Sequence, residues 1–131
     1  MPRLLLVLIM VAAACGGGEE VETTLPVASN AMCADVTDVV VTAESGGTFR
    51  FDVTVRSADT GWEKYADAWE VRAPDGTVLG ERVLAHPHVD EQPFTRSLTG
   101  VAIPDGVAEV EVAARDLVEG FCGETLTVGL T

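Results

Sequence analysis

This chain of 131 residues contains few aromatic and few basic residues. With only four Phe, two Trp and one Tyr, a folded core must be built mainly from Val, Leu, Ile and Ala. Eight Lys and Arg stand against 21 Asp and Glu, which gives a formal charge of −13 and a pI near 4.2. A surface this acidic repels phosphate backbones, so no nucleic-acid partner is expected. Solubility, for instance in a saline habitat, is the simplest explanation of the acidity, and gathering of cations is the alternative.

The apolar run at the amino terminus is short. It covers residues 4–11, follows Arg3, and is succeeded by three alanines. Eight to eleven residues, at about 1.5 Å each in a helix, cannot cross a hydrocarbon core of about 30 Å. A basic start, an apolar middle and a small-residue end are typical of a signal peptide, which we predict over residues 1–14.

Cys15 directly follows Ala12, Ala13 and Ala14, and these four residues resemble the lipobox of bacterial lipoproteins. Ala12 stands where Leu is most common in that family. The resemblance implies that Cys15 becomes the acylated first residue of a protein anchored to a bacterial membrane, with its domain on the extracytoplasmic side of the cell envelope. Several acyl chains, at about 0.8 kcal/mol per buried CH₂, would make that anchor stable. The alternative is a soluble export signal that leaves Cys15 as a spare thiol, which is unusual in a secreted protein.

Residues 15–30 are polar and acidic, without periodicity, and begin with three glycines after the cysteine. This composition predicts a flexible tether. The remaining residues, 31–131, are enough for one domain, which contains Cys33 and Cys122. In an oxidising compartment such as the periplasm, two cysteines form a single intramolecular disulfide bond. Two soft metal ligands are the weaker alternative, because a metal site needs more ligands than this pair.

The clearest structural pattern lies at residues 48–56. Phe49, Phe51, Val53 and Val55 alternate strictly with charged or hydroxyl side chains. This period of two predicts a strand with one dry face, which needs a second layer to cover it.

Six further short segments carry the same kind of pattern, near residues 36–43, 68–72, 78–84, 95–101, 108–114 and 126–130. Turn residues separate them, and no helical period of useful length is present. Seven short strands in about 100 residues predict an all-β, seven-stranded antiparallel β-sandwich. The pattern, including a core Trp69 on the third strand, resembles immunoglobulin and fibronectin type III domains. It lacks the inter-sheet cysteine pair of antibody domains, and the resemblance does not imply a function.

Alternating strand direction assigns the loops to the two ends of such a sandwich. The three long loops, residues 59–67, 86–94 and 116–123, fall at the end where the first strand starts, together with both cysteines. The short turns at residues 74–76 and 104–106 fall at the opposite end. Clustered end loops are where sandwiches usually bind, so we expect any recognition surface at the long-loop end.

Two groups of side chains on these loops are candidate binding residues. Trp62, Tyr65 and Phe121 are large aromatic residues of the kind that dominates interface energies, although they could equally plug the top of the core. His86 and His88, followed by Asp90 and Glu91, could bind Zn²⁺ or Cu²⁺. The simpler explanation is that a histidine ring packs under the loop while the carboxylates are solvated or cap backbone amides.

Catalysis has no clear signature in the chain. No Ser or Cys nucleophile lies plainly beside a histidine and an acid, and carboxylate pairs are too common here to be a signal. We therefore expect a protein that is not an enzyme and needs no cofactor. The sequence favours an envelope lipoprotein whose sandwich domain binds another envelope protein or a surface ligand, and the alternative is a metal-binding protein that uses the His86 and His88 loop.

Overall fold

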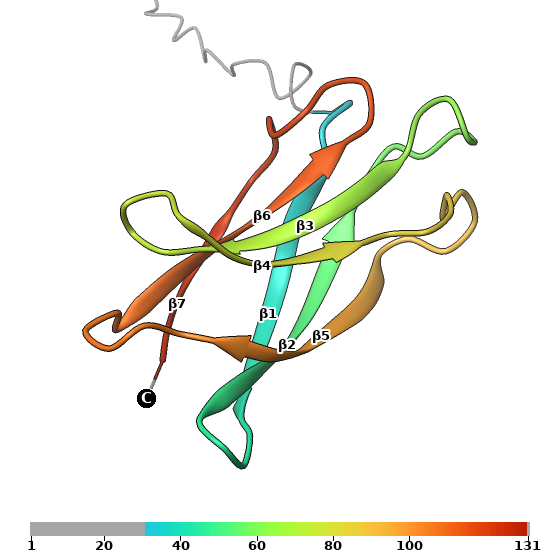
Figure 1. The fold of residues 1–131 in the computed structure, drawn as a ribbon. Coiled ribbons are helices and arrows are strands. Elements are labelled where there is room, and N and C mark those ends of the chain that lie inside the picture. Colours follow the sequence, from blue (N-terminus) through green and yellow to red (C-terminus); the bar gives the residue numbers. More distant parts are fainter. Residues whose placement is uncertain (1–30, 131) are drawn as a thin grey trace, which may run out of the picture.

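A computed structural model describes residues 31–130, so the predicted signal peptide and tether lie outside the described residues. Within 31–130 the chain forms seven strands in two antiparallel sheets, which confirms the expected all-β sandwich (Figure 1). The three-stranded sheet has the order β1-β2-β5 and contains β1 (Asp35–Ala43), β2 (Thr48–Arg56) and β5 (Phe94–Ala102). The four-stranded sheet has the order β4-β3-β6-β7 and contains β3 (Ala66–Arg72), β4 (Val78–Val83), β6 (Glu109–Asp116) and β7 (Leu126–Gly129). None of the described residues belongs to a helix that could span a membrane.

Strand β2 has the bounds that its alternation predicted, and it lies between β1 and β5. Phe51, Val53 and Val55 are fully buried, while Phe49 is partly buried at the strand's start. The opposite face of β2 is polar and carries the Arg50–Asp52 ion pair. Strand β2 therefore has one dry face and one wet face, as its alternation predicted.

Strand β3 is the corresponding inner strand of the other sheet, and it buries Trp69 completely. It begins at Ala66, two residues before the predicted start. Ala66 joins the strand because it pairs with Asp116 on β6, and its N–H donates to the Asp59 carboxylate at 2.9 Å. Glu70, on the outer face of β3, is also buried, so β3 is covered on both sides.

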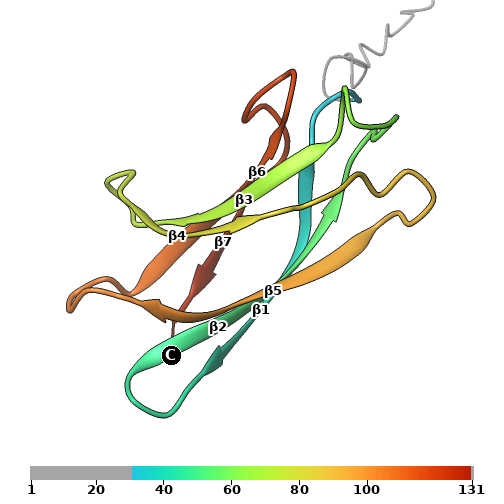
Figure 2. The same ribbon diagram turned by 45° about the vertical axis from the view of Figure 1, so that its right-hand side comes forward.

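The strand directions agree with the predicted alternation. The loops after β2, β4 and β6 lie at one end of the sandwich with the start of β1, and the turns after β1, β3 and β5 lie at the other (Figures 1 and 2). Direct contacts confirm this grouping: the Leu117 N–H donates to the Tyr65 carbonyl at 2.9 Å, and the His88 N–H donates to Asp59 at 2.8 Å. We call this end, made of residues 31–34, 57–65, 84–93 and 117–125, the loop pole.

Candidate functional site

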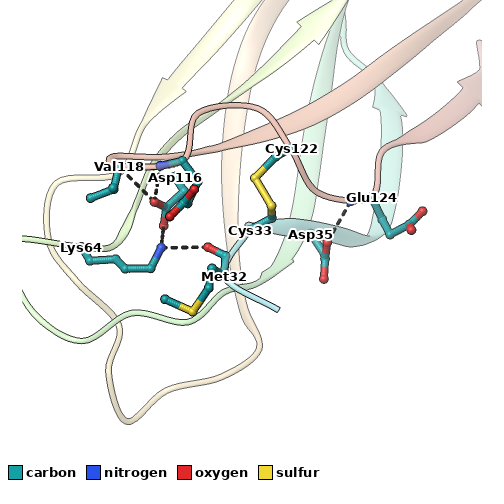
Figure 3. Close-up of a disulfide and its surroundings, with 9 residues drawn as sticks. Met32, Cys33, Asp35, Lys64, Asp116, Val118, Cys122 and Glu124 are labelled. Atoms are coloured by element: carbon teal, nitrogen blue, oxygen red, sulfur yellow. Dashed lines mark hydrogen bonds and ion pairs between the residues drawn. A yellow bond between two sulfur atoms is a disulfide. The ribbon is translucent and has the colours of Figure 1, made fainter. Parts of the chain in front are cut away.

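The loop pole is closed by the disulfide between Cys33 and Cys122, whose Cα atoms are 5.4 Å apart (Figure 3). This confirms the predicted bond and removes the two cysteines as metal ligands. Backbone contacts continue the link beside it: the Val36 N–H donates to the Glu124 carbonyl at 2.9 Å, and the Glu124 N–H donates to the Asp35 carboxylate at 2.8 Å. The start of β1 and the approach to β7 are therefore joined although 89 residues separate the two cysteines.

Lys64 connects three segments of the loop pole. Its ammonium donates to the Met32 carbonyl at 2.8 Å and to the Asp116 carboxylate at 2.7 Å (Figure 3). The second oxygen of Asp116 accepts the N–H groups of Val118 and Glu119, both at 2.9 Å. The Asp116 side chain is fully buried and that of Lys64 is 12% exposed, so the pair is shielded from water and its bonds are charge-assisted.

Asp59 likewise connects the loop between β4 and β5 to its neighbours through hydrogen bonds to its carboxylate. One carboxylate oxygen accepts the Ser57 hydroxyl at 2.7 Å and the Ala66 N–H at 2.9 Å. The other oxygen accepts the backbone N–H of His88 at 2.8 Å. Gln92 adds a second tie, because its amide donates to the His88 carbonyl at 2.9 Å and accepts the Ser57 N–H at 2.9 Å.

The sequence pattern did not predict that these polar residues would hold the loops together. Asp59, Lys64 and Asp116 were placed on the long loops but given no structural role. A signal was present, since Asp59 and Asp116 each stand where a strand gives way to a loop, and Asp side chains there readily accept nearby backbone N–H groups. Their distant partners could not be read from the sequence, because Asp116 and Lys64 are 52 residues apart.

The three predicted aromatic residues lie in different surroundings. Trp62 is 67% exposed at the tip of a tight turn, where its ring meets Tyr65 edge-to-face at a centroid distance of 5.8 Å. Tyr65 is partly buried. Phe121 leans on the outer side of the four-stranded sheet, with the Arg72 guanidinium 4.3 Å from its ring centre. Trp62 and Tyr65 are therefore neighbours, and Phe121 is a separate contact.

Of the two histidines, His86 is exposed and His88 is buried. His88 is 4% exposed and stacks on Phe94 at a centroid distance of 3.8 Å, while its Nε2 lies 2.8 Å from the Arg96 guanidinium. Burial, followed by the nearby Arg96 charge, lowers the pKa of His88. His86 is exposed, and its ring centre lies 4.5 Å from that of His88.

This geometry gives the metal-binding alternative no support. A neutral His88 accepts from Arg96 through Nε2, and its buried Nδ1 then carries the proton, so neither ring nitrogen offers a free lone pair to a metal. Asp90 and Glu91 are exposed, and Glu91 pairs with Arg96 at 3.1 Å. Within residues 31–130 no three His, Cys, Asp or Glu side chains gather as a metal site would require. Zn²⁺ or Cu²⁺ binding stays a prediction that we do not carry into the proposed function.

Exposed apolar side chains are concentrated at the loop pole. Among the described residues, nine large hydrophobic side chains are exposed, and six of them belong to this end: Met32, Trp62, Val89, Leu117, Val118 and Phe121. The other three, Val40, Val78 and Val83, lie on strands. Most of the exposed large hydrophobic side chains of residues 31–130 therefore lie at the end that carries the long loops.

Comparison with known proteins shows a similarity to a protein named as a lipoprotein. No family model matches the chain, and no solved structure matches it. A protein of Halomicrobium mukohataei named "Putative lipoprotein" is 38% identical over 95 residues, which are 72% of this chain and 46% of that protein. The chain therefore matches somewhat less than half the length of this relative. Over most of its own length, the chain is similar to a protein named as a lipoprotein, as the residues around Cys15 had indicated.

Proposed function

We propose that this protein is an envelope lipoprotein, attached to a membrane through Cys15, whose sandwich domain is a binding or assembly module for another envelope protein or a surface ligand. The domain would lie on the extracytoplasmic side. The residues around Cys15 and the name of the relative support the lipoprotein part. The proposal includes no catalytic step and no metal ion.

The observation that carries the binding part is the combination of apolar exposure and fixed loops at the loop pole. Buried carboxylates, the Lys64 ammonium and the disulfide hold the loops in one arrangement. Exposed apolar groups such as Trp62 and Val118 are thus presented by a backbone that is already ordered. A preorganised surface loses little conformational entropy when it binds, so more of its contact energy contributes to affinity.

The attachment is tested by the substitution Cys15→Ser in the full-length chain. We expect the wild-type protein in the detergent-soluble membrane fraction and the variant in the soluble fraction, because the variant cannot be acylated. Cys33→Ser/Cys122→Ser, which keeps Cys15, is the matched control and should remain with the membrane. A Cys15→Ser variant that still fractionates with membranes would contradict the proposed anchor.

Recognition through the loop pole is tested by photocrosslinking in intact envelopes. A photoreactive residue is placed at Trp62 or Val118, and at Val40 or Val78 as matched positions on strands with similar exposure. We expect strong adducts, to protein or to lipid, only from the first two positions. Equal labelling from all four positions would show that the loop pole is not a recognition surface.

A further inference from the structure

Four exposed apolar side chains form the outermost part of the loop pole. Trp62 occupies the tip of the turn closed by the Thr60 N–H and the Lys64 carbonyl at 2.9 Å. Leu117 and Val118 occupy a second tight turn, in which Asp116 and Gly120 exchange two backbone hydrogen bonds. Met32 lies on the segment that leads into β1. Their exposures run from 45% to 67%, and we call these four residues the apolar tip.

The apolar tip is one surface because Lys64 links its three segments. The Lys64 side chain lies between the Met32 carbonyl and the Asp116 carboxylate, which itself holds the turn containing Val118 (Figure 3). Trp62 is two residues from Lys64, and Leu117 bonds to the carbonyl of Tyr65 at 2.9 Å. The four side chains thus come from turns fixed side by side.

The predicted anchor precedes the apolar tip by only a short stretch of sequence. Ala31 precedes Met32, and sixteen peptide units separate Cys15 from Ala31. Even fully extended, that stretch spans at most about 54 Å, at roughly 3.4 Å per residue. Strand β1, with nine residues, carries the chain about 30 Å away from this end. The loop pole is therefore the end of the domain at which the chain arrives from Cys15, and the stretch between them is long enough to let this end reach the lipid.

We propose that the apolar tip rests on the lipid surface to which Cys15 is anchored, with Trp62 and Val118 inserted at the boundary between headgroups and acyl chains. This rests on the proposed function and names the ligand of the same pole. Side chains at the tips of two turns protrude, and a deformable lipid surface accepts protruding groups without a matching pocket. Trp62, beside Tyr65, is the residue type that concentrates at membrane interfaces.

The acidic charge of the protein determines which lipid headgroups the apolar tip can approach. Glu63 and Glu119 are exposed next to the apolar tip, and the chain after Cys15 carries 21 acidic against 7 basic groups. These charges are repelled by anionic headgroups, and salt screens that repulsion. The apolar tip should therefore insert best into membranes with uncharged or zwitterionic headgroups, and insertion into anionic membranes should increase with salt.

The test uses the full acylated protein in phosphatidylcholine vesicles whose acyl chains carry bromine, which quenches nearby Trp fluorescence. Trp69 is fully buried and serves as an internal reference. We expect blue-shifted Trp62 emission and loss of most of its intensity in brominated vesicles. Trp62→Phe should abolish the quenching, Met32→Ser/Val118→Ser should weaken it, and Val40→Ser/Val78→Ser should leave it unchanged. With anionic vesicles, the quenching should fall at low salt and return at high salt.

Unquenched, water-exposed Trp62 emission from vesicle-anchored protein would overturn the inference. If the same Trp62 position still crosslinked strongly to a protein in intact envelopes, the proposed function would stand and the ligand would be that protein. If Cys15→Ser left the protein on membranes and Trp62 crosslinked no better than Val40, the proposed function itself would fail. The two failures are therefore distinguishable.

Discussion

The two ends of the sandwich are stabilised in different ways. At the end opposite the loop pole, the turns depend mainly on their own residues: the Ala73 N–H donates to the Thr77 carbonyl at 2.8 Å, and the Thr77 N–H donates to the Asp75 carboxylate at 2.9 Å. A bond there that joins distant residues, from the Gly100 N–H to the Glu44 carboxylate, is exposed. At the loop pole, buried bonds between residues that are far apart in sequence supplement the local turn bonds. Lys64 and Asp116 are separated by 52 residues, and Asp59 and the His88 N–H by 29.

This difference indicates which changes should spread through the molecule. A turn that depends on its own residues can be altered with a small local effect. Where a loop depends on a buried charge from another loop, removing one partner breaks the bond. It also leaves the other group buried with its desolvation cost uncompensated. Substitutions at the loop pole should therefore cost more stability than those at the opposite end.

Removal of the disulfide should have the largest effect. The bond closes a loop of about 90 residues, and in the chain-entropy model it lowers the entropy of the unfolded chain by the equivalent of ~4–5 kcal/mol. We expect Cys33→Ala/Cys122→Ala, in a Cys15→Ser background, to lose about that amount of unfolding free energy in urea denaturation. The Cys15→Ser protein treated with a reducing agent should behave like the variant. A loss below 1 kcal/mol would mean that the loop pole is held without the bond.

Lys64→Met should follow, because it leaves the buried Asp116 carboxylate without its charged partner. Breaking one side of a buried pair typically destabilises by about 3–5 kcal/mol. The double variant Lys64→Met/Asp116→Asn removes the unpaired charge and keeps an oxygen for the Val118 and Glu119 N–H groups, so it should recover most of the loss. Without such recovery, the cost would have to come from packing and not from the unpaired charge.

Asp59→Asn should have an intermediate effect. The amide retains one oxygen where the carboxylate has two, so either the Ala66 N–H or the His88 N–H loses its acceptor. A buried unsatisfied donor costs about 1–3 kcal/mol. Hydrogen exchange of the His88 amide should accelerate, while exchange in the strands of the opposite end, such as at Val110, stays slow. Uniform acceleration across the domain would show that the loop is not an independent unit.

Gly76→Ala should have a small effect confined to one turn. Gly76 has a φ of +91°, a backbone conformation that costs an L residue about 1–2 kcal/mol. We expect a loss of that size in denaturation, with Trp62 fluorescence unchanged. Gly129→Ala is the matched control, because a Cβ there would contact nothing and its φ is not positive.

The final prediction concerns the slope of stability against pH. Burial lowers the pKa of His88 below 6.5, so between that folded-state pKa and 6.5 the unfolded chain binds more protons than the folded one. Stability should therefore decrease as the pH falls below about 6.5. The decrease should be smaller in His88→Gln than in the wild type. A decrease of equal size in both proteins would assign it to carboxylates instead.

Much of the fold could be predicted from particular patterns. The alternation at residues 48–56 predicted the bounds of β2 correctly. Counting strand directions placed Cys33 and Cys122 together. The start of β3 and the end of β6 were misplaced by two residues because Ala66 and Asp116 form their pair only when the two strands meet. Phe121 lies on the loop after β6, as expected, and the contact of its ring with the Arg72 guanidinium could not be read from the sequence.

The sequence by itself determined the sandwich and the single disulfide, because these follow from short-range periodicity and cysteine number. Lipid attachment at Cys15 stays a prediction from the residues that precede it. Only the tertiary structure decided that Lys64, Asp59 and Asp116 hold the loops, that His88 is buried, and that Trp62 and Val118 protrude together beside the chain's entry. The reason is physical: burial, and the choice of an ionic partner, depend on which distant segments meet in space.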